Sequence, residues 1–147
     1  YLRDEMLDYG LGVDTLETAT RWSKLLDLYE AIHNAIRQTI EKDPDQKPKY
    51  PIVMAHLSHA YLDGASLYFT FVFPRSTSAP SEQWHRIKKS ASDTIRQHGA
   101  TISHHHGIGT DHKPWFVSEK GVLAYELLRQ IKNQIDPKNI LNPGKLI

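Results

Sequence analysis

Three consecutive histidines followed by glycines form the most chemically suggestive stretch of this 147-residue chain. His104, His105 and His106 run directly into Gly107-Ile108-Gly109. Imidazoles change charge near neutral pH, so the run suits proton transfer, although it also suits metal binding or a solvated loop. Glycine lets a backbone approach a flat ligand closely, which favours contact with a cofactor over a bare ion.

A metal site would combine this run with His56 or His59 from an upstream segment. If the run continues a strand, side chains alternate, so His104 and His106 share one face and His105 points to the other. The run contains no carboxylate and the chain contains no cysteine, and both facts disfavour metal binding. The residues alone leave three interpretations open: a solvated loop, a proton-transfer or cofactor contact, and a metal site.

Tyr68 is the second candidate, because it interrupts an apolar pattern. Alternate positions around it form one apolar face: Leu67, Phe69, Phe71 and Phe73. Tyr68 falls on the opposite face with Thr70 and Val72. That face either meets a ligand or a partner domain, or leaves a half-buried tyrosine with its hydroxyl in water.

Hydrophobic periodicity predicts the elements that must position these residues. We expect strands at 13–20, 52–61, 66–73 and 100–103, and helices at 21–42, 84–98 and 119–135. Thr20 is the expected N-cap of the first helix, and a polar, proline-broken loop is expected at 43–51. The order β-α-β-β-α-β predicts an α+β fold, a ferredoxin-like split β-α-β sandwich with helices on one face of an antiparallel sheet, plus a C-terminal helix and tail.

Composition excludes several functional classes. The 18 basic and 17 acidic residues give a net charge of +1, which argues against nucleic acid as the main partner. The absence of cysteine excludes disulfides and thiolate catalysis. No apolar run is long enough to span a bilayer. The Gly107–Gly109 segment lacks the third glycine of a nucleotide loop, so we expect no nucleotide-binding domain within the chain.

Four segments together resemble the C-terminal domain of FAD-linked oxidases of the vanillyl-alcohol-oxidase type: VDTLETATRW (13–22), YLDGASLYFTF (61–71), SHHHGIG (103–109) and DPKNILNPGKL (136–146). The triple histidine with the tyrosine strand points to the alkyldihydroxyacetonephosphate synthase (alkylglycerone-phosphate synthase) branch. The resemblance implies that residues 1–147 are the substrate or cap domain of a flavoprotein, as a fragment without its N-terminal FAD-binding domain. It implies FAD as cofactor and an ether-lipid reaction that exchanges an acyl for an alkyl group on dihydroxyacetone phosphate.

The resemblance also assigns roles to residues. The family's essential triple histidine corresponds to His104, His105 and His106, and its catalytic tyrosine to Tyr68. Chemistry beside a ketone requires a proton to be removed and returned, and we expect Tyr68 and His105 to move it. His104 and His106 are then expected to contact flavin or to orient that pair. The remaining candidates for cofactor contact are Gly107, Asn142 and Lys145.

Two alternatives stay open. D-2-hydroxyacid (glycolate or D-lactate) dehydrogenases of the same superfamily hold a divalent metal through an acid and a hairpin histidine. Here those positions are His105 and Tyr68, which remove the ligands of a hard cation, so we predict no metal. The alternative of another class is a freestanding ferredoxin-like ligand- or metal-sensing module that uses His56, His59 and the histidine run.

The synthase resemblance carries expectations about partners as well. It implies a lipid-like small-molecule substrate, an N-terminal FAD domain in the same protein, and a homodimer as one expected assembly. No nucleic acid and no transmembrane segment are expected. A bacterial protein of this kind would lie in the cytoplasm or at the membrane periphery. The fragment alone is expected to be inactive.

Overall fold

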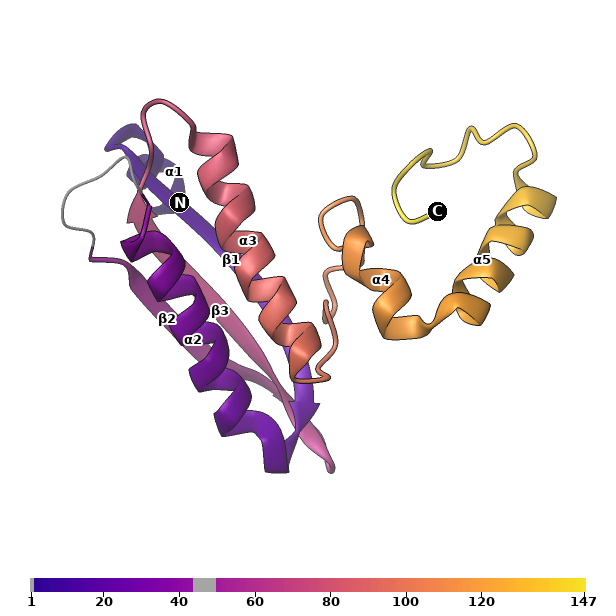
Figure 1. The fold of residues 1–147 in the computed structure, drawn as a ribbon, viewed down its shortest axis with the longest axis horizontal. Coiled ribbons are helices and arrows are strands. Elements are labelled where there is room, and N and C mark those ends of the chain that lie inside the picture. The colour runs from indigo at the N-terminus through magenta and orange to yellow at the C-terminus, as the bar shows by residue number, and fades with distance from the viewer. Residues whose placement is uncertain (1, 44–49) are drawn as a thin grey trace.

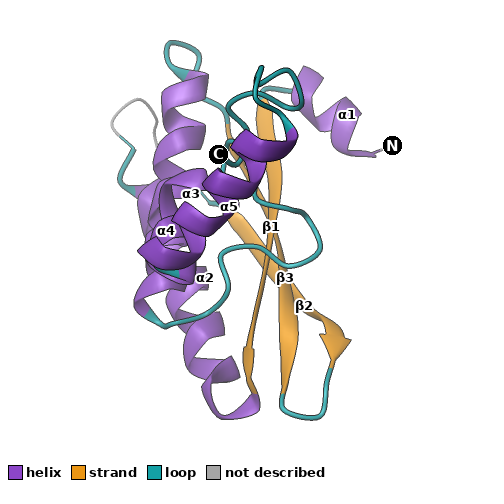
Figure 2. Ribbon diagram, turned by 90° about the vertical axis from the view of Figure 1, so that its right-hand side faces the viewer, coloured by secondary structure: helices purple, strands orange, loops and turns teal. Residues whose placement is uncertain are grey.

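The fold, described by a computed structural model over residues 2–43 and 50–147, is a three-stranded antiparallel sheet with two long helices packed on one face (Figures 1 and 2). The elements are α1 (Leu2–Asp8), β1 (Leu11–Arg21), a 3-10 turn η1 (Trp22–Lys24), α2 (Leu25–Glu41), β2 (Ile52–Ala60), β3 (Gly64–Pro74), α3 (Pro80–Gln97), α4 (Lys113–Lys120) and α5 (Val122–Ile135). The strand order is β1-β3-β2, and both pairings are antiparallel. Helices α2 and α3 cover one face, and the other face is left largely open (Figure 2).

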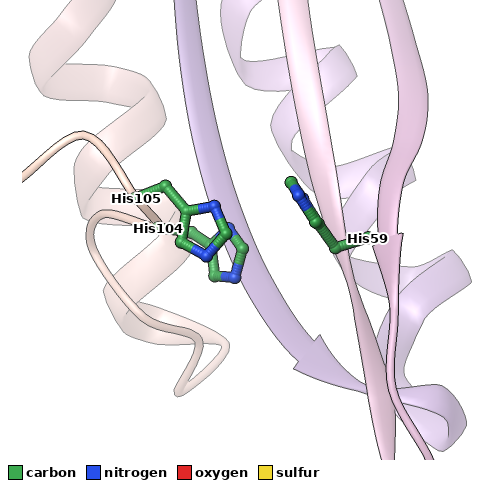
Figure 3. A group of neighbouring side chains, drawn as sticks. All are labelled: His59, His104 and His105. Carbon is green, nitrogen blue, oxygen red and sulfur yellow. The ribbon is translucent and has the colours of Figure 1, made fainter.

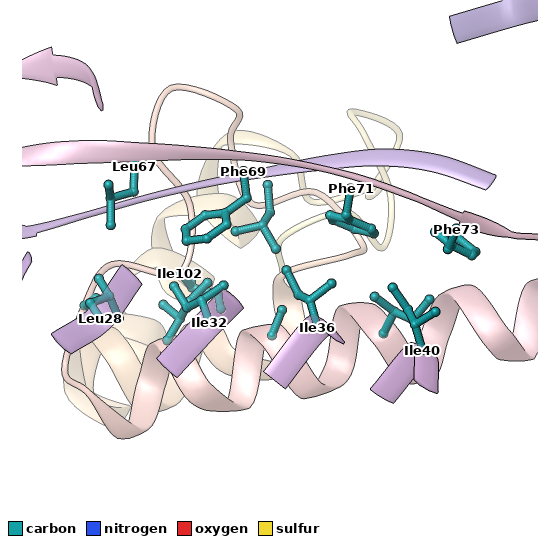
Figure 4. Close-up of a cluster of buried hydrophobic side chains, with 14 residues drawn as sticks. Leu28, Ile32, Ile36, Ile40, Leu67, Phe69, Phe71, Phe73 and Ile102 are labelled. Atoms are coloured by element: carbon teal, nitrogen blue, oxygen red, sulfur yellow. The ribbon is translucent and has the colours of Figure 1, made fainter. Parts of the chain in front are cut away.

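The core lies between β3 and the paired helices, as the alternating apolar pattern predicts. The inward-facing residues of β3 are Leu67, Phe69, Phe71 and Phe73, and those of α2 are Leu28, Ile32, Ile36 and Ile40 (Figure 4). Spacing by four residues brings the α2 side chains onto one stripe. Each fully buried side chain of this size contributes about 1.5–3 kcal/mol relative to exposure. Helix α3 closes the core with Ile87, Ala91 and Ile95.

The expected strand at 100–103 is absent, although this segment lies where a fourth strand would. The Thr101 N–H donates to the Ala19 carbonyl at 3.2 Å, and the His104 N–H donates to the Glu17 carbonyl at 3.2 Å. Between them, the Ile102 N–H donates to the Glu119 carboxylate at 2.6 Å. A regular antiparallel ladder would advance two residues on each strand between such bonds, but here three residues of the segment lie opposite two of β1, so it follows the edge of β1 without forming a strand.

Two helix boundaries also differ from expectation. Thr20 is not a helix N-cap, because β1 continues to Arg21, which pairs with Gly64, and α2 begins only at Leu25 after the 3-10 turn. The helix expected at 119–135 is two helices, since Gly121 separates them with φ 84° and ψ 157°. Only glycine adopts that conformation readily. In the proline-broken loop expected at 43–51, residues 44–49 lie outside the described ranges.

Helix α5 and the C-terminal tail extend away from the sheet and its two helices (Figure 1). An apolar stripe on a helix is ordinarily buried, but Leu127, Ile131 and Ile135 of α5 are exposed. Among the elements that the structure describes, α5 contacts mainly α4. Within residues 2–43 and 50–147, no helix combines the length and apolarity that crossing a bilayer requires.

Candidate active site

Three imidazoles contact one buried carboxylate on the open face of the sheet, and a fourth, that of His105, packs against two of them. We call this group, formed by His59, His104, His105 and His106 around Glu17, the histidine cluster. His59 comes from β2, Glu17 from β1, and the other three from the loop that follows α3. Figure 3 shows His59 reaching from the sheet toward His104 and His105 on the loop.

Glu17 holds the cluster together through both of its carboxylate oxygens. Its Oε1 lies 3.1 Å from Nδ1 of His104, and its Oε2 lies 3.3 Å from Nε2 of His106. Nδ1 of His59 is 3.5 Å from Oε1. The Glu17 side chain is only 3% exposed. A buried carboxylate without partners would be costly, so these contacts are needed for it to remain charged.

The protonation state of Glu17 follows from the same contacts. Burial on its own raises the pKa of the Glu17 carboxyl, but hydrogen bonds from Ser66 and His104 and electrostatic attraction to His104 and His106 outweigh it. The net effect holds the pKa of Glu17 below its usual value. Glu17 is therefore ionised at neutral pH and acts as a hydrogen-bond acceptor toward the imidazoles.

The three loop histidines lie on the same side of the sheet, in contrast to the alternation expected of a strand. His105 has a left-handed backbone with φ 59°, and the His106 N–H donates to the His104 carbonyl at 2.8 Å, which makes a tight turn. The rings of His104 and His105 consequently stack, with centroids 3.9 Å apart. His104 is fixed at both ends, because its Nε2 is 3.0 Å from the Tyr61 hydroxyl.

Tyr68 faces the same open surface, as expected, and its nearest loop histidine is His106. The two rings are 5.5 Å apart between centroids, and His56 stacks on the tyrosine at 5.2 Å. His106 thus lies where we expected His105, which instead contacts the ring of His59 at 4.6 Å. A shallow hollow of about 300 Å³ opens beside Tyr68 between Met54 and Thr70.

The glycines of the loop and one residue of the tail complete the site. Gly107 and Gly109 have φ values of 73° and 56°, and a methyl group added at either would meet no atom within 4 Å. The backbone there is open to close approach by a ligand. Lys145 lines a hollow of about 370 Å³ together with His106 and Gly107. Asn142 lies in a different hollow, beside Ile135 and Leu146, and is not brought to the loop.

Sequence reasoning missed Glu17, the residue that organises the cluster. Its segment resembles any strand of β-branched residues, and only the register between β1 and β3 reveals that Glu17 is opposite Tyr68. Two acidic residues, Asp14 and Glu17, interrupt the apolar and β-branched residues of this strand, and that interruption is the signal that could have identified Glu17. The sequence suggests His59 and His56 only as possible metal ligands. The structure separates them, because His56 stacks on Tyr68 and lies outside the cluster.

The tail that carries Lys145 is attached through Asp136. The Asp136 carboxylate accepts hydrogen bonds from the backbone N–H groups of Ile140 at 3.0 Å and Leu141 at 2.9 Å, and from the Lys132 ammonium. The bond from Lys132, which outweighs the opposing effect of burial, together with the two backbone bonds, lowers the pKa of Asp136 from 3.8 to about 2. The carboxylate is thus the anchor of the tail after α5.

We expect the hydrogen bonds that the Asp136 carboxylate accepts to be lost at acidic pH. Because the folded pKa of Asp136 is below its ordinary value, its stabilising contribution is complete above that value and is lost as the pH falls from about 4 toward about 2. Amide hydrogen exchange should show Ile140 and Leu141 losing protection in that window, and Asp136→Asn should reproduce the loss at neutral pH. Exposed Asp27→Asn is the control, and undiminished protection near pH 2 would contradict the assignment.

Known proteins match the chain over almost its whole length. Residues 2–146 match the sequence profile of the family described as FAD linked oxidases, C-terminal domain. An alkyldihydroxyacetonephosphate synthase from Dictyostelium discoideum is 35% identical over 147 residues, which cover 100% of this chain and 23% of that protein. A solved structure of an alkyldihydroxyacetonephosphate synthase superposes with a TM-score of 0.68 at 26% identity, covering 97% of this chain and 22% of that one.

A representative of the alternative branch matches less of the chain. A mitochondrial D-lactate dehydrogenase (cytochrome) from Arabidopsis thaliana is 27% identical over 107 residues, or 73% of this chain. The chain spans less than a quarter of the synthase, so the likeness concerns the C-terminal part of longer proteins. The identity of fold, the matching profile and the shared segments agree with one another. The chain therefore belongs to the FAD linked oxidases, as a C-terminal domain of that family.

Proposed function

We propose that this chain is the substrate-facing C-terminal part of an FAD-dependent alkyldihydroxyacetonephosphate synthase-like enzyme. The observation that carries the proposal is the location of Tyr68 and His106 on one open face, with ring centroids 5.5 Å apart. Such an enzyme exchanges the acyl group of a lipid-like acyl-dihydroxyacetone phosphate for a long-chain alkyl group. The acyl chain leaves as a fatty acid and the alcohol oxygen forms the new ether bond, so no electrons are gained or lost overall.

The open face fits a flat cofactor ring. Gly107 and Gly109 leave their backbone accessible, and exposed His105 and half-exposed His106 offer polar contacts at its edge. Lys145 adds a positive charge at the rim of the hollow beside His106. FAD would supply a reversible electron acceptor there. The residues of the chain fit this group, with the loop of His104–Gly107 and the tail lysine as its contacts, whereas Asn142 would need the tail to rearrange.

The chain's own residues would handle the proton. A phenol and an imidazole can exchange a proton beside a ketone without leaving an isolated charge in a dry site. We assign this exchange to Tyr68 and His106, with exposed His105, the preceding residue of the loop, as the route by which the proton reaches solvent. His104 is the least mobile of the three, since Glu17 and Tyr61 hold its two ring nitrogens, and it orients the loop.

The exposed apolar residues of α5 support a larger protein around this domain. Leu123, Leu127 and Ile131 remain 85%, 57% and 46% exposed, which is unfavourable for a surface in water. We propose that the N-terminal FAD domain of the same protein covers them, with a second copy in a homodimer as the other candidate. A location in the cytoplasm or at the membrane periphery accords with such a lipid-converting enzyme.

The decisive experiment uses the intact protein with FAD bound. Incubation with acyl-dihydroxyacetone phosphate and a long-chain alcohol should yield one alkyl product and one fatty acid per turnover. D-lactate or glycolate should leave the flavin oxidised under anaerobic conditions. Bleaching of the flavin by either acid, with no ether product, would assign the protein to the D-2-hydroxyacid dehydrogenases instead.

A further inference from the structure

Three imidazoles of the histidine cluster face one another closely enough to share an ion. Each of His59, His104 and His105 offers a ring nitrogen, and these three atoms all lie within 4.8 Å of one another (Figure 3). They come from two segments far apart in the sequence, the bulged end of β2 and the loop after α3. His59 and His105 are exposed, so a dissolved ion can reach the group.

The contacts of Glu17 use only one ring nitrogen of His59 and one of His104. Glu17 Oε1 lies 3.1 Å from Nδ1 of His104 and 3.5 Å from Nδ1 of His59, so both rings turn the same edge toward the carboxylate. Their Nε2 atoms then carry lone pairs that face away from Glu17, and the one on His104 lies 3.0 Å from the Tyr61 hydroxyl. A carboxylate that accepts from one nitrogen of an imidazole while the other nitrogen binds a metal is the usual outer support of metal-binding histidines.

The tautomer of His104 agrees with this arrangement. Nδ1 of His104 lies 3.1 Å from Oε1 of Glu17, and since a carboxylate oxygen accepts hydrogen bonds, Nδ1 is the nitrogen that donates. Its Nε2 then accepts from the Tyr61 hydroxyl, 3.0 Å away. The same lone pair can bind a cation. The Tyr61 hydroxyl would then either move away or take the fourth coordination position of the metal.

We propose that His59, His104 and His105 form a binding site for a divalent transition metal of the Zn²⁺ type, with Glu17 as the outer-sphere acceptor. Imidazole nitrogens suit Zn²⁺, Cu²⁺ and Ni²⁺, whereas Mg²⁺ and Ca²⁺ require oxygen ligands. This site is not the divalent-metal site of the D-2-hydroxyacid dehydrogenases, which we predict the chain to lack. That site needs a carboxylate at position 105 and an imidazole at position 68, where this chain has His105 and Tyr68. Zn–N bonds of about 2.0–2.1 Å require the three nitrogens to close in by roughly 1 Å, which rotation of the exposed His59 and His105 side chains permits.

Metal binding would compete with the chemistry proposed above. A metal on His104 and His105 immobilises the loop and removes His105 from proton transfer. The expected consequence, which rests on the proposed function, is reversible inhibition by Zn²⁺. The binding itself does not depend on that function, so the two can be tested separately.

The test is a Zn²⁺ titration of the intact, chelator-treated protein by isothermal calorimetry. We expect one saturable site per chain, and we expect His59→Ala and His105→Ala each to weaken it about tenfold or more, while Glu17→Gln weakens it by about 10–100-fold. His85→Ala is the matched control, since His85 is exposed on α3 and away from the cluster, and should leave the affinity unchanged. Thermal unfolding of each variant checks that it is folded.

Two outcomes would overturn the site. One is the absence of saturable binding, and the other is a His59→Ala variant that binds Zn²⁺ as tightly as wild type, which would mean surface binding only. In activity assays, inhibition should appear at the Zn²⁺ concentrations that saturate the site, should be reversed by chelator, and should require a higher concentration in His59→Ala. Saturable binding without inhibition would leave the metal site standing and would count against the proton-transfer role of the loop.

Discussion

The Tyr68→Phe variant of the intact protein is expected to lose activity by about 10²–10⁴-fold, the range over which removal of a general acid–base group acts. The substitution deletes one hydroxyl and keeps the ring that contacts His106 and His56. Packing on β3 should therefore be unchanged, because the apolar residues of that strand face the other way. The measurement is the rate of fatty acid release and of alkyl product formation at saturating substrates.

Tyr9→Phe serves as the control for this variant. Tyr9 is exposed and follows α1, so losing its hydroxyl should not change turnover. The flavin spectrum and thermal unfolding of Tyr68→Phe should match those of wild type, which separates chemistry from folding. Turnover by Tyr68→Phe within a few-fold of wild type would remove Tyr68 from proton transfer and would favour a packing role for it.

The Glu17→Gln variant is expected to lower kcat by about 10–100-fold with little change in KM, because displacement of a catalytic group by about 1 Å can cost 10²-fold. The two carboxylate oxygens of Glu17 lie 3.1 Å from Nδ1 of His104 and 3.3 Å from Nε2 of His106. A glutamine has the same shape but offers one acceptor and one donor. One of the two imidazoles must then reverse its tautomer or turn away, and the alignment of His106 with Tyr68 is lost.

Substitution of a comparable but exposed acid tests whether this effect is specific. Glu30→Gln on α2 removes one negative charge at the surface and should leave kcat unchanged. Acid titration adds a second readout for Glu17. Since the folded pKa of Glu17 is lowered, the stability that Glu17 contributes is present at neutral pH and is lost as the pH falls below its usual value. Equal kcat for Glu17→Gln and wild type would show that the carboxylate serves only to stabilise the fold.

The sequence predicted the elements that depend on local patterns. Alternation in β3 identified the core face and, with it, the outward direction of Tyr68, because a strand has a period of two residues. The spacing of Ile32, Ile36 and Ile40 identified α2 for the same kind of reason. The fold class follows from the order of such elements, so it too was accessible.

What the sequence could not supply depends on contacts between distant residues. The segment 100–103 has the composition of a strand, but it follows β1 with three residues opposite two, and the Glu119 carboxylate, 17 positions away, accepts from the N–H of Ile102. Glu17 joins His104 across 87 positions. No local pattern encodes either contact. The exposure of the apolar stripe of α5 could not be predicted for a related reason. An apolar helix face predicts burial but does not identify the surface that buries it.

The left-handed backbone of His105 has a consequence for how this loop can vary. A residue with a side chain is disfavoured at φ 59° by about 1–2 kcal/mol, and the loop would fold more readily with glycine there, as it has at Gly107 and Gly109. Stability and activity therefore impose opposite requirements on one position. A substitution at position 105 that stabilises the protein should therefore lower its activity.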